Sequence, residues 1–194
     1  MQFPKSQYYQ GDFNKKIICY HHTMGYSAQS SIDWFIEDSV KVGTQYVIDR
    51  DGTEFELWED NGYAFQYGLV NVPRRMEFEQ CSIGIEIANL GPLNKLVNGA
   101  YIDQYKRAYN GEVFRCKYRG FEYWEVYKEA QYAKLREMTG TLAEKHKIKL
   151  NPTNHLNFDL SVFDKNTVIT HVNVRKDKTD VSPAFEWAKA IPKG

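Results

Sequence analysis

The sequence has few cysteines, no excess of either charge and no long hydrophobic run. Cys19, Cys81 and Cys116 are odd in number and widely spaced, which argues against a disulfide framework but leaves one bridge and one free thiol open. Lys and Arg total 25, as do Asp and Glu, so overall charge gives no reason to expect nucleic acid or an anionic membrane as a partner. No apolar run reaches about 18 residues, so we expect no membrane-spanning helix.

The N-terminus lacks the apolar core of a signal peptide, so we expect synthesis in the cytoplasm without a leader and a soluble monomer. The length of 194 residues fits one domain, 1–194, and 42% hydrophobic residues suffice for its core. Aromatic residues reach 15%, including 14 Tyr. That excess fits a groove for glycan or peptide, and equally fits tyrosines at the edge of a core.

Strand-like and helix-like segments alternate along the chain. Strands are expected over 16–20, 44–48, 53–57, 81–89 and 167–171, and helices over 27–40, 125–147 and 182–190. Ser30 and Ser31 are the expected caps of the first helix. Residues 1–14 read as an N-terminal arm and 92–122 as an inserted loop or hairpin excursion. The pattern predicts an α/β fold: a single domain with a central mixed β-sheet flanked by helices.

Two of the expected strands end in histidine. His21 follows an apolar run, His171 ends another, and Asp180 follows nine positions later with Lys178 just before it. Two imidazoles and a carboxylate are a ligand set for catalytic Zn²⁺, which takes three protein ligands and keeps one position open. Each residue taken alone is more often structural, and the spacing is not a compact ligand motif. The spacing alone therefore leaves both a metal-binding role and a structural role open for these residues.

Glu86 lies in the middle of the nearly continuous apolar run 81–89. An ionised Glu is rarely buried without a partner, so it needs an ion pair, a metal or a cleft. Metal-assisted hydrolysis requires a carboxylate that accepts the proton of water and a cation for the developing oxyanion. Glu86 and Lys178 are candidates for these two roles, although a structural ion pair and a solvated lysine are the simpler alternatives.

Four ordered blocks give the chain a family resemblance. They are HHT at 21–23, VGTQYVIDRDGT at 42–53, SIGIE at 82–86, and His171 followed by KTD at 178–180. Together they resemble the zinc-dependent N-acetylmuramoyl-L-alanine amidases, the family of phage lysozyme-type amidases and peptidoglycan recognition proteins. The resemblance runs from about residue 15 to 190 and leaves 92–122 unmatched.

The resemblance implies an amidase-like fold, Zn²⁺ as cofactor, and hydrolysis of the amide between N-acetylmuramic acid and L-alanine in peptidoglycan or muropeptides. It places the metal ligands at His21, His171 and Asp180, with His22 as a neighbour. It assigns Glu86 as the base and Lys178 as the partner of the oxyanion.

The chain departs from the family pattern at two places. Thr44 stands where some members have a catalytic Tyr, but Glu86 occupies the place of the carboxylate that the Asp-ligand branch uses as base, so the loss of the Tyr is not disabling. The second departure is FQYG at 65–68, where many relatives carry WHAG. If the histidine of that motif binds the substrate or the transition state, Gln66 alters affinity or rate rather than zinc binding.

Two alternative functions remain: a non-catalytic peptidoglycan-binding module, and a zinc peptidase that cuts within the stem peptide. The expected setting is either a bacteriolytic phage or prophage endolysin, released by a holin or carried in the virion, or a cytoplasmic enzyme that recycles muropeptides. Residues 92–122 either shape the substrate groove or form a solvated hairpin.

Overall fold

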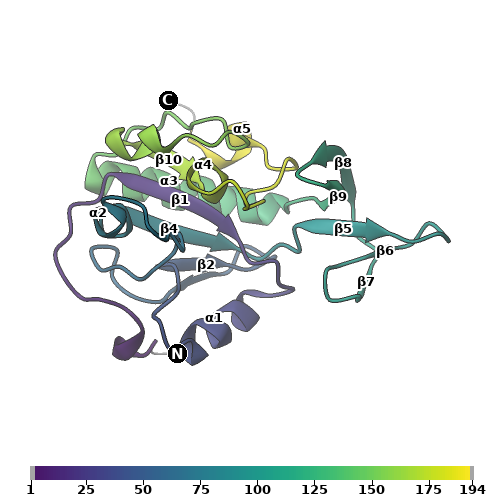
Figure 1. Ribbon diagram of the computed structural model, residues 1–194, viewed down its shortest axis with the longest axis horizontal. Helices are drawn as coiled ribbons and strands as arrows, with labels where there is room; N and C mark the ends of the chain where they lie inside the picture. Colours follow the sequence, from purple (N-terminus) through teal and green to yellow (C-terminus); the bar gives the residue numbers. More distant parts are fainter. Residues whose placement is uncertain (1–2, 193–194) are drawn as a thin grey trace.

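The computed structural model describes residues 3–192, so residues 1–2 of the expected arm and residues 193–194 lie outside the described part. The main sheet has five strands in the order β10-β1-β4-β2-β3 (Figure 1). They are β1 (Ile17–His22), β2 (Tyr46–Ile48), β3 (Glu54–Glu56), β4 (Ser82–Ile87) and β10 (Thr167–Thr170). Neighbouring strands are parallel except β3, which is antiparallel to β2. The predicted central mixed sheet is confirmed.

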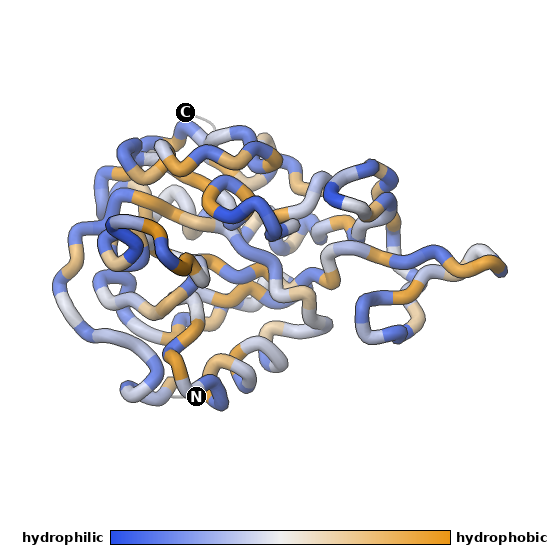
Figure 2. Tube along the Cα trace, viewed as in Figure 1, coloured by the Kyte–Doolittle hydropathy of each residue, from blue (hydrophilic) through white to orange (hydrophobic). Residues whose placement is uncertain are grey.

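Helices cover both faces of this sheet. Helix α3 (Glu129–His146) packs on the face that carries Ile18 and Tyr20, with the short α5 (Trp187–Ala190) beside it. The other face carries Ile17 and Cys19 and is covered by α2 (Arg75–Gln80) and α4 (His171–Val174), and farther along by α1 (Ala28–Glu37). Because side chains alternate along a strand, β1 contributes side chains to two separate hydrophobic layers, one on each face of the sheet. Figure 2 shows hydrophobic stretches along the strands between these layers.

A second, antiparallel sheet occupies residues 92–125. Its strands are β5 (Pro92–Lys95), β6 (Tyr101–Ile102), β7 (Ala108–Tyr109), β8 (Val113–Tyr118) and β9 (Phe121–Glu125), in the order β7-β6-β5-β9-β8. In Figure 1 it projects to the right of the main sheet. The segment that the sequence suggested as an excursion is thus an ordered sheet attached to the edge of the main body.

Several element boundaries differ from the sequence predictions. The cap of α1 is Ser27, whose hydroxyl oxygen accepts a hydrogen bond from the backbone of Ser30 at 3.3 Å. Helix α3 starts at Glu129 because Glu125 belongs to β9, and the last helix is limited to α5. Short 3₁₀ turns lie at Lys5–Gln7 and Leu160–Asp164. None of the helices within residues 3–192 has the length and apolar character needed to cross a membrane.

A buried ion pair joins the two sheets. Arg50, in the turn after β2, contacts both carboxylate oxygens of Glu125, with Nη2 2.8 Å from Oε2. The side chain of Glu125 is fully buried and also accepts a hydrogen bond from the backbone of Leu90. Replacing Arg50 with methionine is expected to lower the free energy of unfolding by ~3–5 kcal/mol, because the carboxylate stays buried without its charge partner. Urea unfolding at neutral pH measures this loss.

Arg115→Met is the matched control. Arg115, on the edge strand β8 of the second sheet, pairs with Glu122 of the neighbouring β9, and 72% of the arginine side chain is exposed. An exposed pair contributes only ~0–1 kcal/mol. Equal losses of stability in the two variants would show that the buried pair is not what holds the sheets together.

Candidate functional site

The carboxyl ends of β1, β4 and β10 meet at one edge of the main sheet. Tyr20 pairs with Thr170 in the parallel register, so the next residues, His21 and His171, emerge from adjacent strands. On its other side, His21 pairs with Glu86 of β4. Ligands of open α/β sheets bind at the carboxyl ends of parallel strands. The register therefore places three chemically active side chains together at the expected edge.

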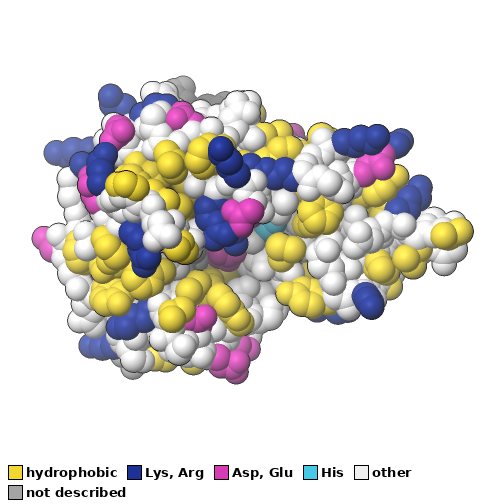
Figure 3. All heavy atoms as spheres, viewed as in Figure 1, with side chains coloured by type: hydrophobic (Ala, Val, Ile, Leu, Met, Phe, Trp, Pro, Cys, Tyr) yellow, Lys and Arg dark blue, Asp and Glu magenta, His cyan; other side chains and the backbone are white. Residues whose placement is uncertain are grey.

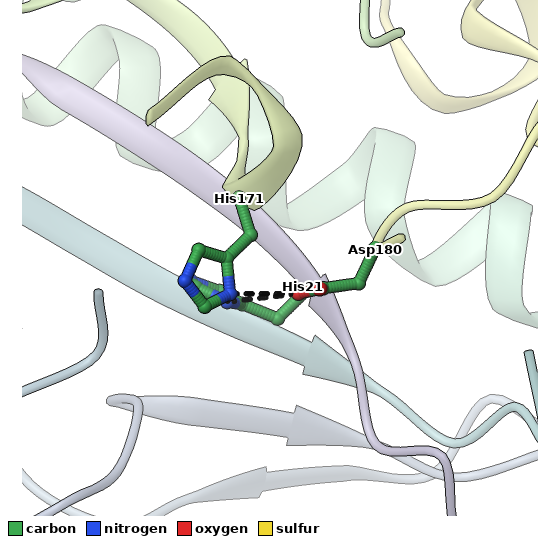
Figure 4. Close-up of side chains that lie close together, drawn as sticks. All are labelled: His21, His171 and Asp180. Carbon is green, nitrogen blue, oxygen red and sulfur yellow. Dashed lines mark hydrogen bonds and ion pairs between the residues drawn. The ribbon is translucent and has the colours of Figure 1, made fainter. Parts of the chain in front are cut away.

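His21, His171 and Asp180 converge on one point (Figure 4). The Nδ1 atoms of the two histidines are 3.1 Å apart. Oδ2 of Asp180 lies 2.9 Å from Nδ1 of His171 and 3.3 Å from Nδ1 of His21. All three residues are buried, with exposed fractions of 3%, 4% and 7%. The structure thus brings together residues that lie up to 159 positions apart in the sequence.

The outer nitrogen of each imidazole faces a hydrogen-bond acceptor. Nε2 of His171 lies 3.0 Å from the carbonyl oxygen of Tyr67, and Nε2 of His21 lies 3.1 Å from Oε1 of Gln66. A neutral imidazole that donates through Nε2 presents a lone pair at Nδ1. Two such lone pairs and a carboxylate repel each other unless a cation lies between them. The donor set therefore fits a metal ion, with the outer contacts orienting the ligands.

Asp180 is ionised in this environment. Burial disfavours its charged form, but its interactions with the neighbouring His171 and His21 outweigh burial and hold the pKa of Asp180 well below its usual range. The carboxylate is therefore in the form that a metal ligand needs.

Glu86 lies beside this cluster and makes no hydrogen bond through its carboxylate to any residue of 3–192. Burial raises its pKa to about 7, Asp180 adds to the rise, and the nearby His21 and Lys178 oppose it. Lys178 is half-buried and lines the same cleft. A carboxyl group whose pKa lies near neutrality is suited to accept and release a proton.

The other histidines lie away from the cluster. His22 points to the opposite face of the sheet, where its Nδ1 is 3.0 Å from the hydroxyl of Tyr127, and burial lowers its pKa to about 4. His146 pairs with Asp60 at 2.7 Å, and His155 packs against the aromatic rings near α5. Only the first histidine of the 21–22 pair faces Asp180.

Gln66 is a contact that the sequence did not reveal. It accepts from His21, and it can lie flat on the sheet because Gly84 has no side chain: a Cβ there would come within 2.5 Å of Gln66 Oε1. Gln66 therefore contacts the candidate metal ligand His21 directly, in addition to any contact on the substrate side of the site. Thr44 is buried, and its hydroxyl donates to the carbonyl of Tyr46 at 3.0 Å.

Arg119 is a second such contact. It lies in the turn between β8 and β9, and its guanidinium donates to the backbone carbonyls of Arg175, at 3.2 Å, and of Lys178. The second sheet thus holds the loop that carries both Lys178 and Asp180. No local motif predicts this, because the donor and acceptors are more than fifty positions apart.

The cluster lies in a cleft of about 670 Å³. Its lining includes His21, Glu86, Lys178, Tyr26, Trp34, Tyr105 and Arg107. Figure 3 shows histidine atoms in a hollow between the main body and the second sheet, with charged and hydrophobic side chains at its border. The arrangement combines a donor set that fits a metal ion, a carboxyl group with a pKa near neutrality beside it, and room for an extended ligand.

Comparisons with known proteins place this geometry in context. A family model described as N-acetylmuramoyl-L-alanine amidase matches residues 12–183. A structure of AmpD, as a selenomethionine derivative, superposes with a TM-score of 0.54 at 16% identity, covering 97% of this chain and 89% of AmpD. No curated protein sequence matches the chain significantly.

Two further solved structures share the fold. The N-acetylmuramyl-L-alanine amidase AmiD from E. coli, in complex with anhydro-N-acetylmuramic acid-L-Ala-D-γ-Glu-L-Lys, gives a TM-score of 0.60 at 17% identity, covering 93% of this chain and 59% of AmiD. The amidase LysC from Clostridium intestinale gives 0.53 at 13% identity, covering 98% of this chain and 91% of LysC. The described chain therefore has the amidase fold.

Proposed function

Because the chain belongs to the N-acetylmuramoyl-L-alanine amidase family, we propose that it hydrolyses the amide bond between N-acetylmuramic acid and L-alanine in peptidoglycan or muropeptides. The observation that carries the proposal is the convergence of His21, His171 and Asp180 beside Glu86 in a cleft. The substrate held by AmiD, an anhydromuramoyl tripeptide, supports this class of substrate.

Zn²⁺ is the proposed metal, with His21, His171 and Asp180 as its ligands. Nitrogen and carboxylate oxygen are common zinc donors, and tetrahedral coordination at ~2.0–2.2 Å places ligand atoms ~3.3–3.6 Å apart. The three separations of 3.1, 2.9 and 3.3 Å come close to this spacing. Three protein ligands leave one coordination position open for chemistry.

Glu86 is the proposed acid/base residue. When bound, zinc supplies Lewis acidity, which polarises a carbonyl oxygen and lowers the pKa of water. Glu86 accepts the proton of the attacking water and then delivers it to the nitrogen of the leaving L-alanine. Its raised pKa suits a group that must bind and release a proton in one catalytic cycle.

Lys178 is the proposed partner of the oxyanion that forms at the scissile carbonyl. It shares the cleft with Glu86, and the backbone contact from Arg119 holds its loop in place. A fixed positive charge stabilises developing negative charge most effectively in a site that excludes water.

Gln66 is expected to support zinc binding. Gln66→Met keeps the length of the side chain but removes the acceptor for Nε2 of His21, so we expect zinc affinity to fall ~10–100-fold. Competition with a chromogenic chelator measures the affinity without any assay of activity.

Gln45→Met is the matched control for this prediction. Gln45 is also buried, but it hydrogen-bonds Gly62, Ser82 and Gly84 rather than a histidine. The control should change stability and leave the zinc affinity of the folded protein near that of the parent. A similar loss of affinity in both variants would contradict the proposed contact.

Digestion of purified sacculi tests the proposed reaction. The zinc-loaded protein should release stem peptides with free L-alanine N-termini and leave intact glycan strands, as identified by mass spectrometry. A chelator should abolish release, and added zinc should restore it.

The same fragments separate the alternative functions. Cleavage between two amino acids of the stem would identify a peptidase, and binding without any release would identify a binding module. Comparing rates on intact sacculi and on soluble muropeptides separates the two proposed settings: a phage endolysin should act on the polymer, and a recycling enzyme on the soluble fragments.

A further inference from the structure

The second sheet contributes one wall of the cleft. The turn 103–107, between β6 and β7, carries Tyr105 and Arg107, and both line the cleft that contains Glu86 and Lys178. This turn lies within 92–122, the segment that the sequence suggested as an inserted excursion. Tyr26, in the segment between β1 and α1, also lines the cleft.

A buried carboxylate shapes this turn. Asp103 is 2% exposed, and its Oδ1 accepts hydrogen bonds from the backbone of Tyr105 at 2.8 Å and of Arg107 at 2.9 Å. Its Oδ2 accepts from Nε of Arg107 at 2.6 Å. The arginine head is therefore held in place before any ligand arrives, which lowers the entropy that binding must overcome.

The guanidinium keeps donors for a ligand. Nε is used by Asp103, while neither Nη atom of Arg107 makes a hydrogen bond within residues 3–192. The ring of Tyr105 lies 5.0 Å from the guanidinium carbon, and the ring of Tyr26 lies 6.0 Å from it. These tyrosines are 66% and 63% exposed. An anchored arginine with unused donors, next to two exposed aromatic rings, is suited to bind an anionic ligand.

We propose that Arg107 binds a carboxylate of the stem peptide and thereby selects substrates whose peptide is acidic. This inference rests on the proposed amidase function. A γ-linked glutamate, as in the substrate held by AmiD, leaves its α-carboxylate free, and the C-terminal residue carries a second carboxylate. The two free Nη donors match the two oxygens of either group.

Substrate amidation tests this assignment. Binding of muramoyl-L-Ala-D-γ-Glu-L-Lys to the Glu86→Gln protein is measured by calorimetry with three ligands: the free acid, the glutamate α-amide and the C-terminal amide. Amidating the recognised carboxylate should weaken binding by roughly 10–100-fold, the range for a hydrogen bond to a charged group. In the protein that retains Arg107, the amide of the recognised carboxylate should bind more weakly than the free acid. In the Arg107→Met background, the free acid and this amide should bind equally well.

Two additional variants serve as controls for this test. Arg107→Lys retains the charge and should recover part of the preference for the acid. Arg115→Met lies on the same sheet outside the cleft and should bind as the parent does. Zinc content and thermal unfolding confirm that each variant is folded.

The outcomes separate the two levels of the proposal. If the parent protein cuts the substrate but Arg107→Met weakens acid and amide ligands equally, or not at all, the recognition role is wrong and the amidase function stands. If the parent neither cuts nor binds the acid, the proposed function and this inference are both overturned.

Discussion

Replacing Glu86 with glutamine is expected to lower kcat on muropeptide by ~10²–10⁴-fold while the protein keeps its zinc. Glutamine has nearly the same shape but cannot accept the proton of the attacking water. Glu86 makes no hydrogen bond to the candidate ligands, so the metal centre should persist. The rate is measured per zinc-loaded chain, with zinc determined by elemental analysis.

Glu56→Gln is the control for this variant. Glu56 is an exposed carboxylate on β3 of the same sheet and lies outside the cleft. It should retain the kcat of the parent. A Glu86→Gln protein that lyses cell walls at the rate of the parent would remove Glu86 from the mechanism.

Replacing His171 with alanine is expected to abolish zinc binding and, with it, activity. Two remaining protein ligands hold zinc much more weakly than three, and the vacated position exposes the site to water. Zinc content after dialysis should fall from about one ion per chain to a small fraction of that. His21→Ala should behave in the same way, because its Nδ1 also faces Asp180.

The neighbouring histidine supplies a matched control. His22 is equally buried and adjacent in sequence to His21, but it faces Tyr127 on the other side of the sheet. His22→Ala should lose stability and keep its zinc. Loss of zinc from His22→Ala but not from His21→Ala would reverse the assignment of the ligand.

The sequence was sufficient to predict the parts of the fold that local patterns determine. The apolar runs before His21 and His171 predicted two strands that end in candidate ligands, and the run around Glu86 predicted a central strand. Because side chains alternate along a strand, the adjacent His21 and His22 face opposite sides of the sheet, His21 toward Asp180 and His22 toward Tyr127.

Features that depend on distant contacts were not predictable in this way. Glu125 reads as the start of a helix, but it pairs with Val113 as part of β9, and its carboxylate binds Arg50. Gln66 reads as a departure from a motif, and its contact with His21 emerges only when the chain folds over Gly84. Such contacts depend on tertiary packing, which overrides local propensity.

The second sheet shows the same limit at the scale of a whole segment. Its turn signals suggested a hairpin, but not which strands pair or what they face. The structure shows that this segment holds the Lys178 loop through Arg119 and lines the cleft through Arg107. The sequence left a groove-shaping element and a solvated hairpin as alternatives, and these contacts support the first.

Anomalous diffraction at the zinc absorption edge, on crystals grown with zinc, would locate the metal and its ligands. We expect one peak ~2.0–2.2 Å from Nδ1 of His21, Nδ1 of His171 and a carboxylate oxygen of Asp180, with Glu86 outside the coordination sphere. A peak coordinated by Glu86 or His22, or no peak between the two Nδ1 atoms, would contradict the proposed set of metal ligands.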